Sequence, residues 1–366
     1  MDILFLGDYS NFHVSLAKEL RQLGHRAIVV SSGSRCMDTE RDINLIRKPG
    51  KWGGLKYAGR VWSLLPKMSN FDVVQLINPS FLDLKPAKIR YFFNELRRRN
   101  KMIALSMAGN DSVFVKECCE AQTFRYSEFR IGTELAPFAI VNPNVEVNWQ
   151  TNEMLGFCQY IYNNVDCAIS CLYEYQKVGA KYLGEKLGYI GIPIDVENIK
   201  YEPLHIEDKI NIAVGIKSEY MSFKGTDRLL NVAKKIEQMF SDKCRVFVLK
   251  DLPYNEYMKK LKNSHIVLDQ LYSYTPATNA LGAMAMGKVV VSGAEPEFYD
   301  FINEHELSPI VNVLPNDDDI YNKLLSLIND RDALKRRGEQ SRLFVERHNS
   351  AHLVVERYIQ HLSKYM

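Results

Sequence analysis

Short apolar runs alternate with helix-like stretches along the whole chain. The first apolar run covers residues 3–6, and beyond a turn at 7–11 apolar side chains recur with helical spacing over 14–23. Gly24 ends this predicted helix, and residues 27–31 form the next apolar run. Continuous apolar runs of this length are typical of buried parallel strands. The N-terminal region therefore predicts a strand–helix–strand unit, the usual start of a doubly wound α/β fold.

The same alternation continues in two successive sets of elements. Further strands are predicted at 73–77, 102–106 and 167–170 in the first set, and at 210–215, 245–249, 265–269 and 289–291 in the second. A turn-like stretch at 191–195 separates the two sets. We therefore predict two αβα domains, at 1–190 and 191–349, and a final helix at 350–366 that packs back across the boundary.

The composition is that of an ordinary globular protein. A chain of 366 residues, of which 46% are hydrophobic and 25% are charged, is long enough for two domains. With 47 basic and 44 acidic residues the net charge is +3, which is too balanced for a dedicated nucleic-acid binder. We therefore expect no nucleic-acid partner.

The cysteines and the N-terminus indicate a cytoplasmic protein. The seven cysteines form no CxxC pair, so neither a disulfide framework nor a zinc site is indicated and reduced thiols are expected. They are Cys36, Cys118, Cys119, Cys158, Cys167, Cys171 and Cys244. The first residues carry no basic region and no cleavage site, and no apolar run approaches the ~20 residues that span a bilayer. We expect a cytoplasmic location, with peripheral contact at the inner membrane face as an option.

The strongest chemical motif lies in the second set of elements. The strand at 265–269 leads into a loop of small and polar residues, and a short apolar helix follows at 280–286. The start of such a helix presents unpaired N–H groups and a positive dipole end to an anion. Hydroxyl groups of Thr275 and Thr278 would add donors. Alternatively these residues only cap the helix, and the pattern alone favours neither interpretation.

Residues 264–291 resemble the donor-binding segment of retaining glycosyltransferases with the GT-B fold, the group 1 or family 4-like enzymes. The family stretch Glu-Ala-Met-Ala-x-Gly-Lys-x-Val-Val is matched by Gly282-Ala283-Met284-Ala285-Met286-Gly287-Lys288-Val289-Val290. A related subgroup begins this segment with Asp-Gln, as Asp269 and Gln270 do here. The resemblance covers essentially the whole chain, although the N-terminal half matches only in layout. It implies two Rossmann-like domains that face each other across a cleft.

Two positions depart from the family pattern. The family glutamate that often binds the ribose is replaced by Gly282, and the earlier acidic position of the paired-glutamate motif corresponds to Tyr274. Both departures concern donor binding and activity rather than the fold.

The resemblance also implies roles for residues around this segment. The family places one cation after the first strand of the C-terminal domain and a Lys-Gly pair before the next helix, and both cations face the donor diphosphate. Lys217 and Lys224 fit these catalytic roles, and the alternative is that both are ordinary solvated lysines. The implied donor-binding residues are Gly215, Gly225, Asp269, Gln270, Thr275, Ala277, Thr278, Asn279 and Gly282.

The acceptor side is implied by the first strand-to-helix turn, which faces the cleft in this fold. Its candidate residues are Asp8, Tyr9, Ser10, Asn11 and His13. Asp111 follows the strand at 102–106, where similar proteins often show Gly-Ser-Asp, and would hold the transferred sugar. The alternatives are that Asp111 caps the next helix and that His13 is a packed side chain.

Residues 48–68 suggest contact with a membrane surface. The segment interleaves lysines and arginines with Trp52, Trp62 and aliphatic residues, a pattern suited to an anionic membrane. A second basic cluster lies at 97–101, and a lipid-linked acceptor would account for both. We favour the alternative, an exterior helix whose tryptophans pack on the sheet.

The sequence thus predicts a transferase that moves a sugar from a nucleotide-diphosphate sugar to a saccharide or lipid-linked acceptor. The resemblance implies cell-surface polysaccharide or glycolipid synthesis, retained anomeric configuration, no metal and no cofactor beside the donor substrate. One alternative is a sugar-nucleotide epimerase, which needs a clear set of acid and base groups that the sequence does not display. The other is a non-catalytic protein that binds a sugar nucleotide or a partner, which would account for Tyr274 and Gly282.

Overall fold

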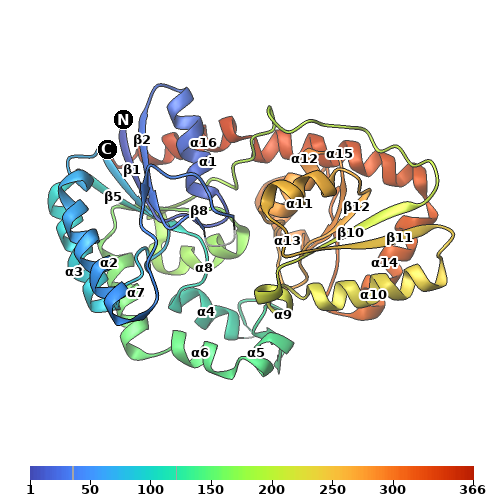
Figure 1. Cartoon of the computed structure of the whole chain (residues 1–366), viewed down its shortest axis with the longest axis horizontal. Helices are drawn as coiled ribbons and strands as arrows, with labels where there is room; N and C mark the ends of the chain where they lie inside the picture. The colour runs from blue at the N-terminus through green and yellow to red at the C-terminus, as the bar shows by residue number, and fades with distance from the viewer. Residues whose placement is uncertain (35–36, 121) are drawn as a thin grey trace. The chain divides into compact units, whose positions relative to one another are not determined.

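The chain folds into two compact α/β units in the computed structural model (Figure 1). The structure describes residues 1–34, 37–120 and 122–366, so Cys36 lies outside the described residues. Unit 1 consists of residues 1–116, 144–193 and 351–366, and unit 2 consists of residues 117–143 and 194–350. Each unit holds its own parallel sheet, which confirms the expected α/β class with two Rossmann-like domains.

The sheet of unit 1 has seven parallel strands in the order β3-β2-β1-β4-β5-β8-β9. The strands are β1 (Asp2–Leu6), β2 (Arg26–Ser31), β3 (Ile43–Asn44), β4 (Val73–Leu76), β5 (Met102–Met107), β8 (Cys167–Ser170) and β9 (Leu187–Tyr189). Strands β4, β5 and β8 are buried along their whole length, so helices cover both faces as the continuous apolar runs predict. Strands β3 and β9 at the sheet edges were not predicted, because two or three residues make no recognisable run.

Helices surround this sheet. Those of unit 1 are α1 (Phe12–Gln22), α2 (Gly50–Leu64), α3 (Pro86–Arg99), α4 (Ser112–Cys119), α6 (Pro143–Trp149), α7 (Asn152–Asn164), α8 (Tyr173–Leu183) and α16 (Ala351–Leu362). The last helix, α16, packs against α1, and its Tyr358 hydroxyl donates a hydrogen bond of 3.0 Å to Gln75 inside the sheet. The end of the chain is therefore part of the core of unit 1.

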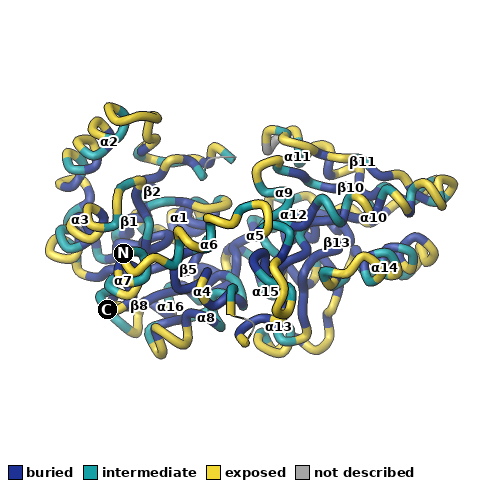
Figure 2. The backbone as a smooth tube through the Cα atoms, turned by 90° about the horizontal axis from the view of Figure 1, so that it is seen from below, coloured by how far each residue is buried: buried dark blue, intermediate teal, exposed yellow. Residues whose placement is uncertain are grey.

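The sheet of unit 2 has five parallel strands in the order β11-β10-β12-β13-β14. The strands are β10 (Ile210–Ile216), β11 (Cys244–Lys250), β12 (Ile266–Leu268), β13 (Val289–Ser292) and β14 (Val311–Asn312). The following helices accompany them: α9 (Met221–Lys224), α10 (Thr226–Met239), α11 (Tyr254–Leu261), α12 (Thr278–Ala285), α13 (Pro296–Phe301), α14 (Asp317–Asn329) and α15 (Arg331–Asn349). Figure 2 shows the central strands of both units as buried and the outer turns of the helices as exposed.

Residues 117–143, which we call the strap, belong to unit 2 although they lie within the predicted N-terminal domain. The strap contains the short hairpin β6 (Arg130–Ile131) and β7 (Glu134–Leu135) and the helix α5 (Pro137–Val141). Because the strap joins unit 2 and α16 joins unit 1, the chain passes between the units at 116/117, 143/144, 193/194 and 350/351. The predicted domains require only two of these passages.

The order of the strands defines one switch point in each sheet. In unit 1, β1 lies between β2, the next strand of the chain, and β4. In unit 2, β10 lies in the same way between β11 and β12. Helices on opposite faces diverge at such a point, so the carboxyl ends of the two strands border a crevice where ligands of open α/β sheets bind. The loops after β1, β10 and β12 are therefore where the candidate site must be sought.

None of the described helices combines the length and hydropathy needed to cross a bilayer.

Candidate functional site

Asp269 is the centre of a polar network at the switch point of unit 2. It directly follows β12, and only 2% of its side chain is exposed. Its Oδ1 accepts a hydrogen bond of 2.9 Å from the Asn279 amide and lies 3.7 Å from the Lys224 ammonium nitrogen. Its Oδ2 has no hydrogen-bond partner among the described residues. A buried carboxylate with one open oxygen is costly, which marks this position as a candidate for function.

The network continues from Asn279 to β10 through a residue that the sequence did not single out. The Tyr257 hydroxyl on α11 donates a hydrogen bond of 2.7 Å to Asn279 Oδ1. The tyrosine ring also packs on Gly215, where an added Cβ would lie 2.7 Å from its hydroxyl oxygen. Gly215 is thus needed for space. No feature of the helical pattern around 254–262 distinguishes Tyr257 from an ordinary surface tyrosine.

Lys224 is held beside this network by the backbone. Its carbonyl accepts a hydrogen bond of 2.8 Å from the Leu271 amide, which ties the end of α9 to the loop after β12. Gly225 follows with a φ of 69°, and an added Cβ would lie 2.8 Å from the Leu271 side chain. Both constraints favour glycine. The Lys-Gly pair therefore turns the chain so that the lysine side chain reaches Asp269.

Lys217 has a different environment. Its ammonium group donates a hydrogen bond of 3.2 Å to the Leu252 carbonyl, beyond the end of β11. Of the two predicted cations, Lys224 is therefore the one that the structure places against Asp269. Lys217 is half-buried at the mouth of β10 and is not an ordinary solvated lysine.

The start of α12 is where the sequence predicts either an anion site or a helix cap. Ala277 is the N-cap residue, and its side chain makes no capping hydrogen bond. Thr278 is the first helical residue, and Thr275 is buried three positions before it. Further along α12, an added Cβ on Gly282 would meet no atom within 4 Å. The helix thus presents its first N–H groups and an open position where the family carries a glutamate.

Gln270 fixes the loop between β12 and α12. Its side-chain amide nitrogen donates to Ser273 Oγ at 2.9 Å and to the Thr275 carbonyl at 3.3 Å, and its backbone carbonyl accepts from the Gly293 N–H at 3.2 Å. A Cβ on Gly293 would lie 1.7 Å from the Ser273 carbonyl oxygen, so the two loops touch through their backbones. The predicted donor segment is therefore a rigid loop.

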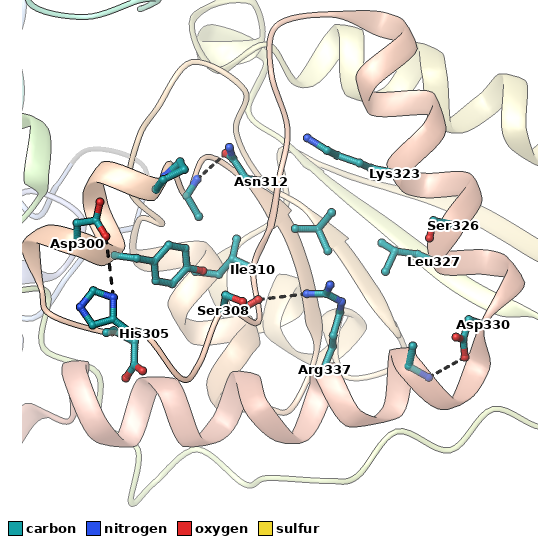
Figure 3. A pocket seen from close by; sticks show the side chains of 16 residues that line it. Asp300, His305, Ser308, Ile310, Asn312, Lys323, Ser326, Leu327, Asp330 and Arg337 are labelled. Atoms are coloured by element: carbon teal, nitrogen blue, oxygen red, sulfur yellow. Dashed lines mark hydrogen bonds and ion pairs between the residues drawn. The ribbon is translucent and has the colours of Figure 1, made fainter.

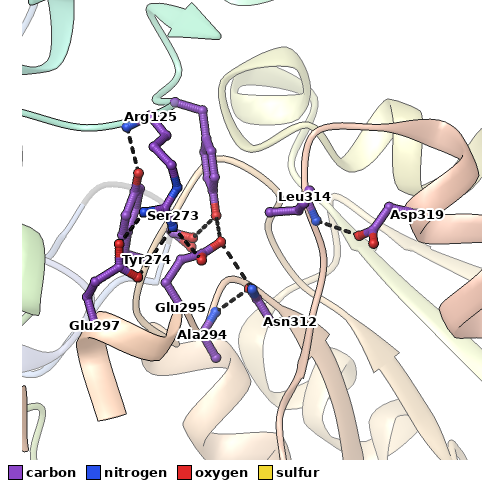
Figure 4. Close-up of polar contacts among 10 residues, drawn as sticks. Arg125, Ser273, Tyr274, Ala294, Glu295, Glu297, Asn312, Leu314 and Asp319 are labelled. Carbon is purple, nitrogen blue, oxygen red and sulfur yellow. Dashed lines mark hydrogen bonds and ion pairs between the residues drawn. The ribbon is translucent and has the colours of Figure 1, made fainter. Parts of the chain in front are cut away.

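The strap is bound to this loop by a cluster of charged and aromatic side chains (Figure 4). The Arg125 guanidinium donates to the buried Glu295 at 2.6 Å and also pairs with Glu297. The Tyr126 hydroxyl donates to Glu295, and the backbone N–H of Arg125 donates to the Tyr274 hydroxyl at 2.7 Å. Tyr274, at the position of a family glutamate, therefore serves to hold the strap.

A second contact of the strap reaches the helix that carries Lys224. Phe138 on α5 packs edge-on against Phe223, with ring centroids 5.1 Å apart. Sequence reasoning missed the strap because residues 117–143 show no regular apolar period and their partners lie more than 80 positions away.

At the switch point of unit 1, Asp8 and His13 are structural residues. Asp8 accepts hydrogen bonds from the His13 amide at 2.9 Å and from the Thr39 hydroxyl at 2.8 Å. His13 is 0% exposed, and its ring nitrogens lie 2.7 Å from the Gly7 carbonyl and 2.8 Å from Ser106 Oγ. Burial lowers the pKa of His13 to about 3. His13 is the packed residue of the alternative, and contact of Asp8 or His13 with an acceptor stays a prediction.

Asp111 is also fully engaged. Its Oδ1 accepts from the amides of Val113 and Phe114 at 2.9 Å each, and its Oδ2 accepts from the Tyr162 hydroxyl at 2.6 Å. Asp111 thus caps α4, as the alternative proposed, and its role in holding a sugar stays a prediction. Burial raises its pKa.

The exposed part of this switch point is the turn after Asp8. Ser10 and Asn11 have positive φ values of 51° and 67°, and Tyr9 is exposed beside Gly109. The Ser10 amide donates to Ser34 Oγ at 2.7 Å, which fixes the turn. Of the predicted acceptor-side residues, Tyr9 and Ser10 are exposed and Asn11 is half-buried.

Comparison with solved structures identifies the fold. No protein-family model matches the sequence, and a search of curated proteins found no significant match. Sucrose-phosphate synthase from Thermosynechococcus elongatus matches with a TM-score of 0.65 at 11% identity, over 100% of this chain and 99% of its own. HepE of Anabaena, in complex with UDP and glucose, matches with a TM-score of 0.59 at 14% identity, over 100% of both chains. The chain has the GT-B fold.

The GT-B fold does not by itself decide the chemistry. A Listeria monocytogenes protein assigned as a UDP-N-acetylglucosamine 2-epimerase matches with a TM-score of 0.56 at 11% identity, over 99% of this chain and 96% of its own. Transferases and an epimerase thus share this architecture. The function has to be argued from the side chains of the site.

Unit 2 of the GT-B chain also contains an open groove of about 600 Å³ between α13, α14 and α15 (Figure 3). None of the predicted site residues lines it. Its charged side chains already have partners, since Asp300 lies 3.9 Å from His305 and Arg337 donates to the Ser308 carbonyl at 3.2 Å. The switch point is therefore the better candidate site. Within the described residues no group of three or more His, Cys, Asp or Glu side chains is arranged to hold a metal ion.

Proposed function

We propose that this GT-B chain is a glycosyltransferase whose sugar donor is a nucleoside-diphosphate sugar. The observation that carries the proposal is the network at the unit 2 switch point, where Lys224 lies 3.7 Å from the buried Asp269. A donor bound there would meet a cation, the N-terminal end of α12 and the open position at Gly282. The UDP in the HepE complex supports a nucleoside diphosphate as the ligand class.

The residues of the network have distinct roles in this proposal. Lys224 stabilises the negative charge that develops on the diphosphate as its bond to the anomeric carbon breaks. Asp269, fixed by Asn279, keeps the lysine oriented before the donor arrives. Lys217 supplies a second cation from the end of β10. The acceptor oxygen bonds to the anomeric carbon as the bond from that carbon to the diphosphate breaks, and the acceptor proton passes to an oxygen of the leaving diphosphate, so no protein side chain is assigned as a dedicated base.

Retention of configuration and independence of metal ions are further parts of the proposal. They rest on the family resemblance and on the presence of two lysines where the diphosphate would lie. NMR of the first product formed would report its anomeric configuration. Activity that survives EDTA would support metal independence, and activity restored only by an added divalent ion would refute it.

The acceptor is proposed to be a saccharide or a lipid-linked saccharide, in cell-surface polysaccharide or glycolipid synthesis. The exposed turn of Tyr9, Ser10 and Asn11 offers hydroxyl and amide groups suited to sugar hydroxyls. An epimerase is less well supported, because Asp8, Asp111 and His13 are buried and hydrogen-bonded and supply no free acid–base set.

A thermal-shift screen against UDP, GDP, ADP, CMP and their sugar conjugates tests the donor site. A ligand that binds the native state at 100 times its Kd adds about 2.7 kcal/mol of stability, so Tm rises for the correct nucleotide. Lys224→Ala should remove most of this shift, which is measured against the variant's own ligand-free Tm because the buried Asp269 loses its cation and that Tm should itself be lower. Lys235→Ala, an exposed lysine on α10, is the matched control and should keep the shift.

The outcomes separate the proposed function from its alternatives. If no nucleotide shifts the Tm of folded protein, the donor site is refuted. A selective shift without transfer to any acceptor tested would favour a non-catalytic binding protein. Conversion of the donor sugar to its epimer would favour the epimerase.

A further inference from the structure

The chain around α2 carries positive charge without any acidic residue. Between residues 43 and 71 there is no Asp or Glu. The basic side chains in this stretch are Arg47, Lys48, Lys51, Lys56, Arg60 and Lys67. The last five of these form no ion pair within the part of the chain that the structure describes. Such a stretch has an uncompensated positive field that reaches into solvent.

The second basic cluster of the sequence differs, because its charges are partly compensated. Arg98 and Arg99 both pair with Glu95 on α3, and Lys101 lies 2.7 Å from Asp72. Arg97 donates to the neutral Asn164 amide, so four basic side chains at 97–101 meet two carboxylates and about half of the positive charge remains. That the cluster joins 48–68 in binding an anionic surface stays a prediction.

The inner face of α2 attaches the helix to unit 1. Tyr57 and Val61 are buried, and the Trp62 ring lies 5.4 Å from Tyr91 and 5.1 Å from Phe92 between centroids. Trp62 therefore packs as the favoured interpretation of the sequence expects. Tyr57, Val61 and Trp62 thus hold the helix on unit 1, and Trp52 takes no part in this packing.

The outer face of α2 differs from the favoured interpretation, in which both tryptophans pack on the sheet. Trp52 is 78% exposed and Leu55 is 61% exposed, so neither packs on the sheet. Lys56 and Arg60 lie on the same side of the helix, because positions three to four apart share a face. Figure 2 shows α2 as one of the most exposed helices of its unit. Exposing a tryptophan to water is unfavourable unless a partner covers it.

We propose that the outer face of α2 docks on an anionic lipid surface. Tryptophan and leucine would enter the boundary between headgroups and acyl chains, and the lysines and arginine would meet the acidic headgroups. Apolar side chains flanked by cations fit this partner better than a nucleic acid, which offers phosphates but no apolar layer to receive Leu55. Docking through this face would bring the protein to a lipid-linked acceptor. The docking itself does not depend on the proposed transferase activity.

Sedimentation of the full chain with phospholipid vesicles tests this inference. The chain should sediment with vesicles of phosphatidylcholine mixed with phosphatidylglycerol, remain in solution with phosphatidylcholine alone, and dissociate as salt is added. Trp52 emission should shift to the blue on binding. No sugar nucleotide is present, so the result is independent of the test of the donor site.

Two double variants separate the apolar and the charged contributions. Trp52→Ala with Leu55→Ala should abolish sedimentation and the blue shift, and Lys56→Glu with Arg60→Glu should weaken binding by about tenfold or more. The matched control is Lys259→Glu with Lys260→Glu on α11, which changes net charge equally and should bind as the unmodified chain does. All the replaced side chains are exposed, so their thermal unfolding should match that of the original chain.

Three results would overturn the proposal. The first is an unmodified chain that stays in solution with anionic vesicles at low salt. The second is equal binding to both kinds of vesicle, which would leave the lysines without a role. The third is unchanged binding of the Trp52→Ala, Leu55→Ala variant, which would place the contact elsewhere on the molecule.

Discussion

Three aspartates at the carboxyl edges of the two sheets show how neighbours decide a side chain's role. Asp8 and Asp111 have both oxygens occupied by backbone N–H groups and hydroxyls, so they hold local structure. Asp269 is equally buried, but one oxygen has no partner among the described residues and the other is shared with Lys224. The sequence identifies all three as following a strand. It does not reveal which hydrogen bonds are satisfied, because the partners come from distant parts of the chain.

Gly282 allows a direct test of the donor-site geometry. A glutamate at this position would introduce the residue carried there by the glycosyltransferases that the segment resembles, and the structure has space for its Cβ. We expect Gly282→Glu to tighten binding of the nucleotide found in the thermal-shift screen by several-fold, because a carboxylate would reach the ribose hydroxyls. Calorimetric titration with the nucleoside diphosphate measures this affinity.

Gly282→Ala is the matched control for this variant. Replacing a helical glycine with a good helix former such as alanine or glutamate stabilises the native state by roughly 0.5–1 kcal/mol, so both variants should raise Tm. Only the glutamate should change the affinity. If both variants bind the nucleotide as the original chain does, Gly282 does not face the ribose.

Glu304 makes stability depend on pH in the acidic range. Burial alone would raise its pKa, but hydrogen bonds from His348, the backbone amides of Leu307 and Glu306, and Arg347 lower it to about 2. The unfolded carboxyl takes up its proton near 4.5, so this contribution is complete above pH 4.5 and is lost as the pH falls toward 2.

Urea unfolding across this pH range measures the effect. The free energy of unfolding should fall as the solution is acidified, and the fall should be smaller in Glu304→Gln, which has no charge to lose. Equal slopes in the two proteins would show that Glu304 does not titrate in this way.

At the scale of elements, the length of the apolar run decided what the sequence could predict. Strands β1, β4, β5 and β8 and strands β10 to β13 match the predicted runs, whereas β3, β9 and β14 are too short to be recognised. The strap escaped prediction for another reason. Arg125 attaches the strap by pairing with Glu295 and Glu297, which lie 170 and 172 positions away in the sequence. Local sequence patterns cannot predict pairs that are so far apart.

Arg125→Ala should loosen the strap and the loop that it holds. Glu295 would lose its charged partner while remaining buried, and we expect a loss of roughly 1–3 kcal/mol of stability. Nucleotide affinity should fall as well, because Tyr274 belongs to the donor loop. Urea unfolding and calorimetric titration measure the two effects.

Arg98→Ala on α3 is the control for this prediction. Its partner Glu95 keeps a second arginine, Arg99, and the pair is on the surface, so stability should change by less than about 0.5 kcal/mol. If Arg125→Ala is equally mild, the strap is held by its aromatic contacts rather than by the arginine.

At the scale of the whole molecule, the two units are each assembled from segments that are distant in the sequence. Unit 1 includes α16 from the end of the chain. Tyr358 on this helix belongs to a buried hydrogen-bond network with Gln75, Ser106 and His13. Unit 2 recovers the strap from the first half. The sequence predicted the number and class of the units, but their composition depends on side-chain contacts that only the folded chain displays.

The strap sets a rule for recombination between this chain and other GT-B proteins. A chimera joined once, near residue 190, that keeps the second half of this chain would pair it with a foreign segment at 117–143 that evolved beside different loops. Glu295 would then face a side chain other than Arg125, and Phe223 would lose its matched aromatic partner. Exchange of the second unit therefore needs crossovers at both ends of the strap as well as at 193 and 350, so that interacting residues are inherited together.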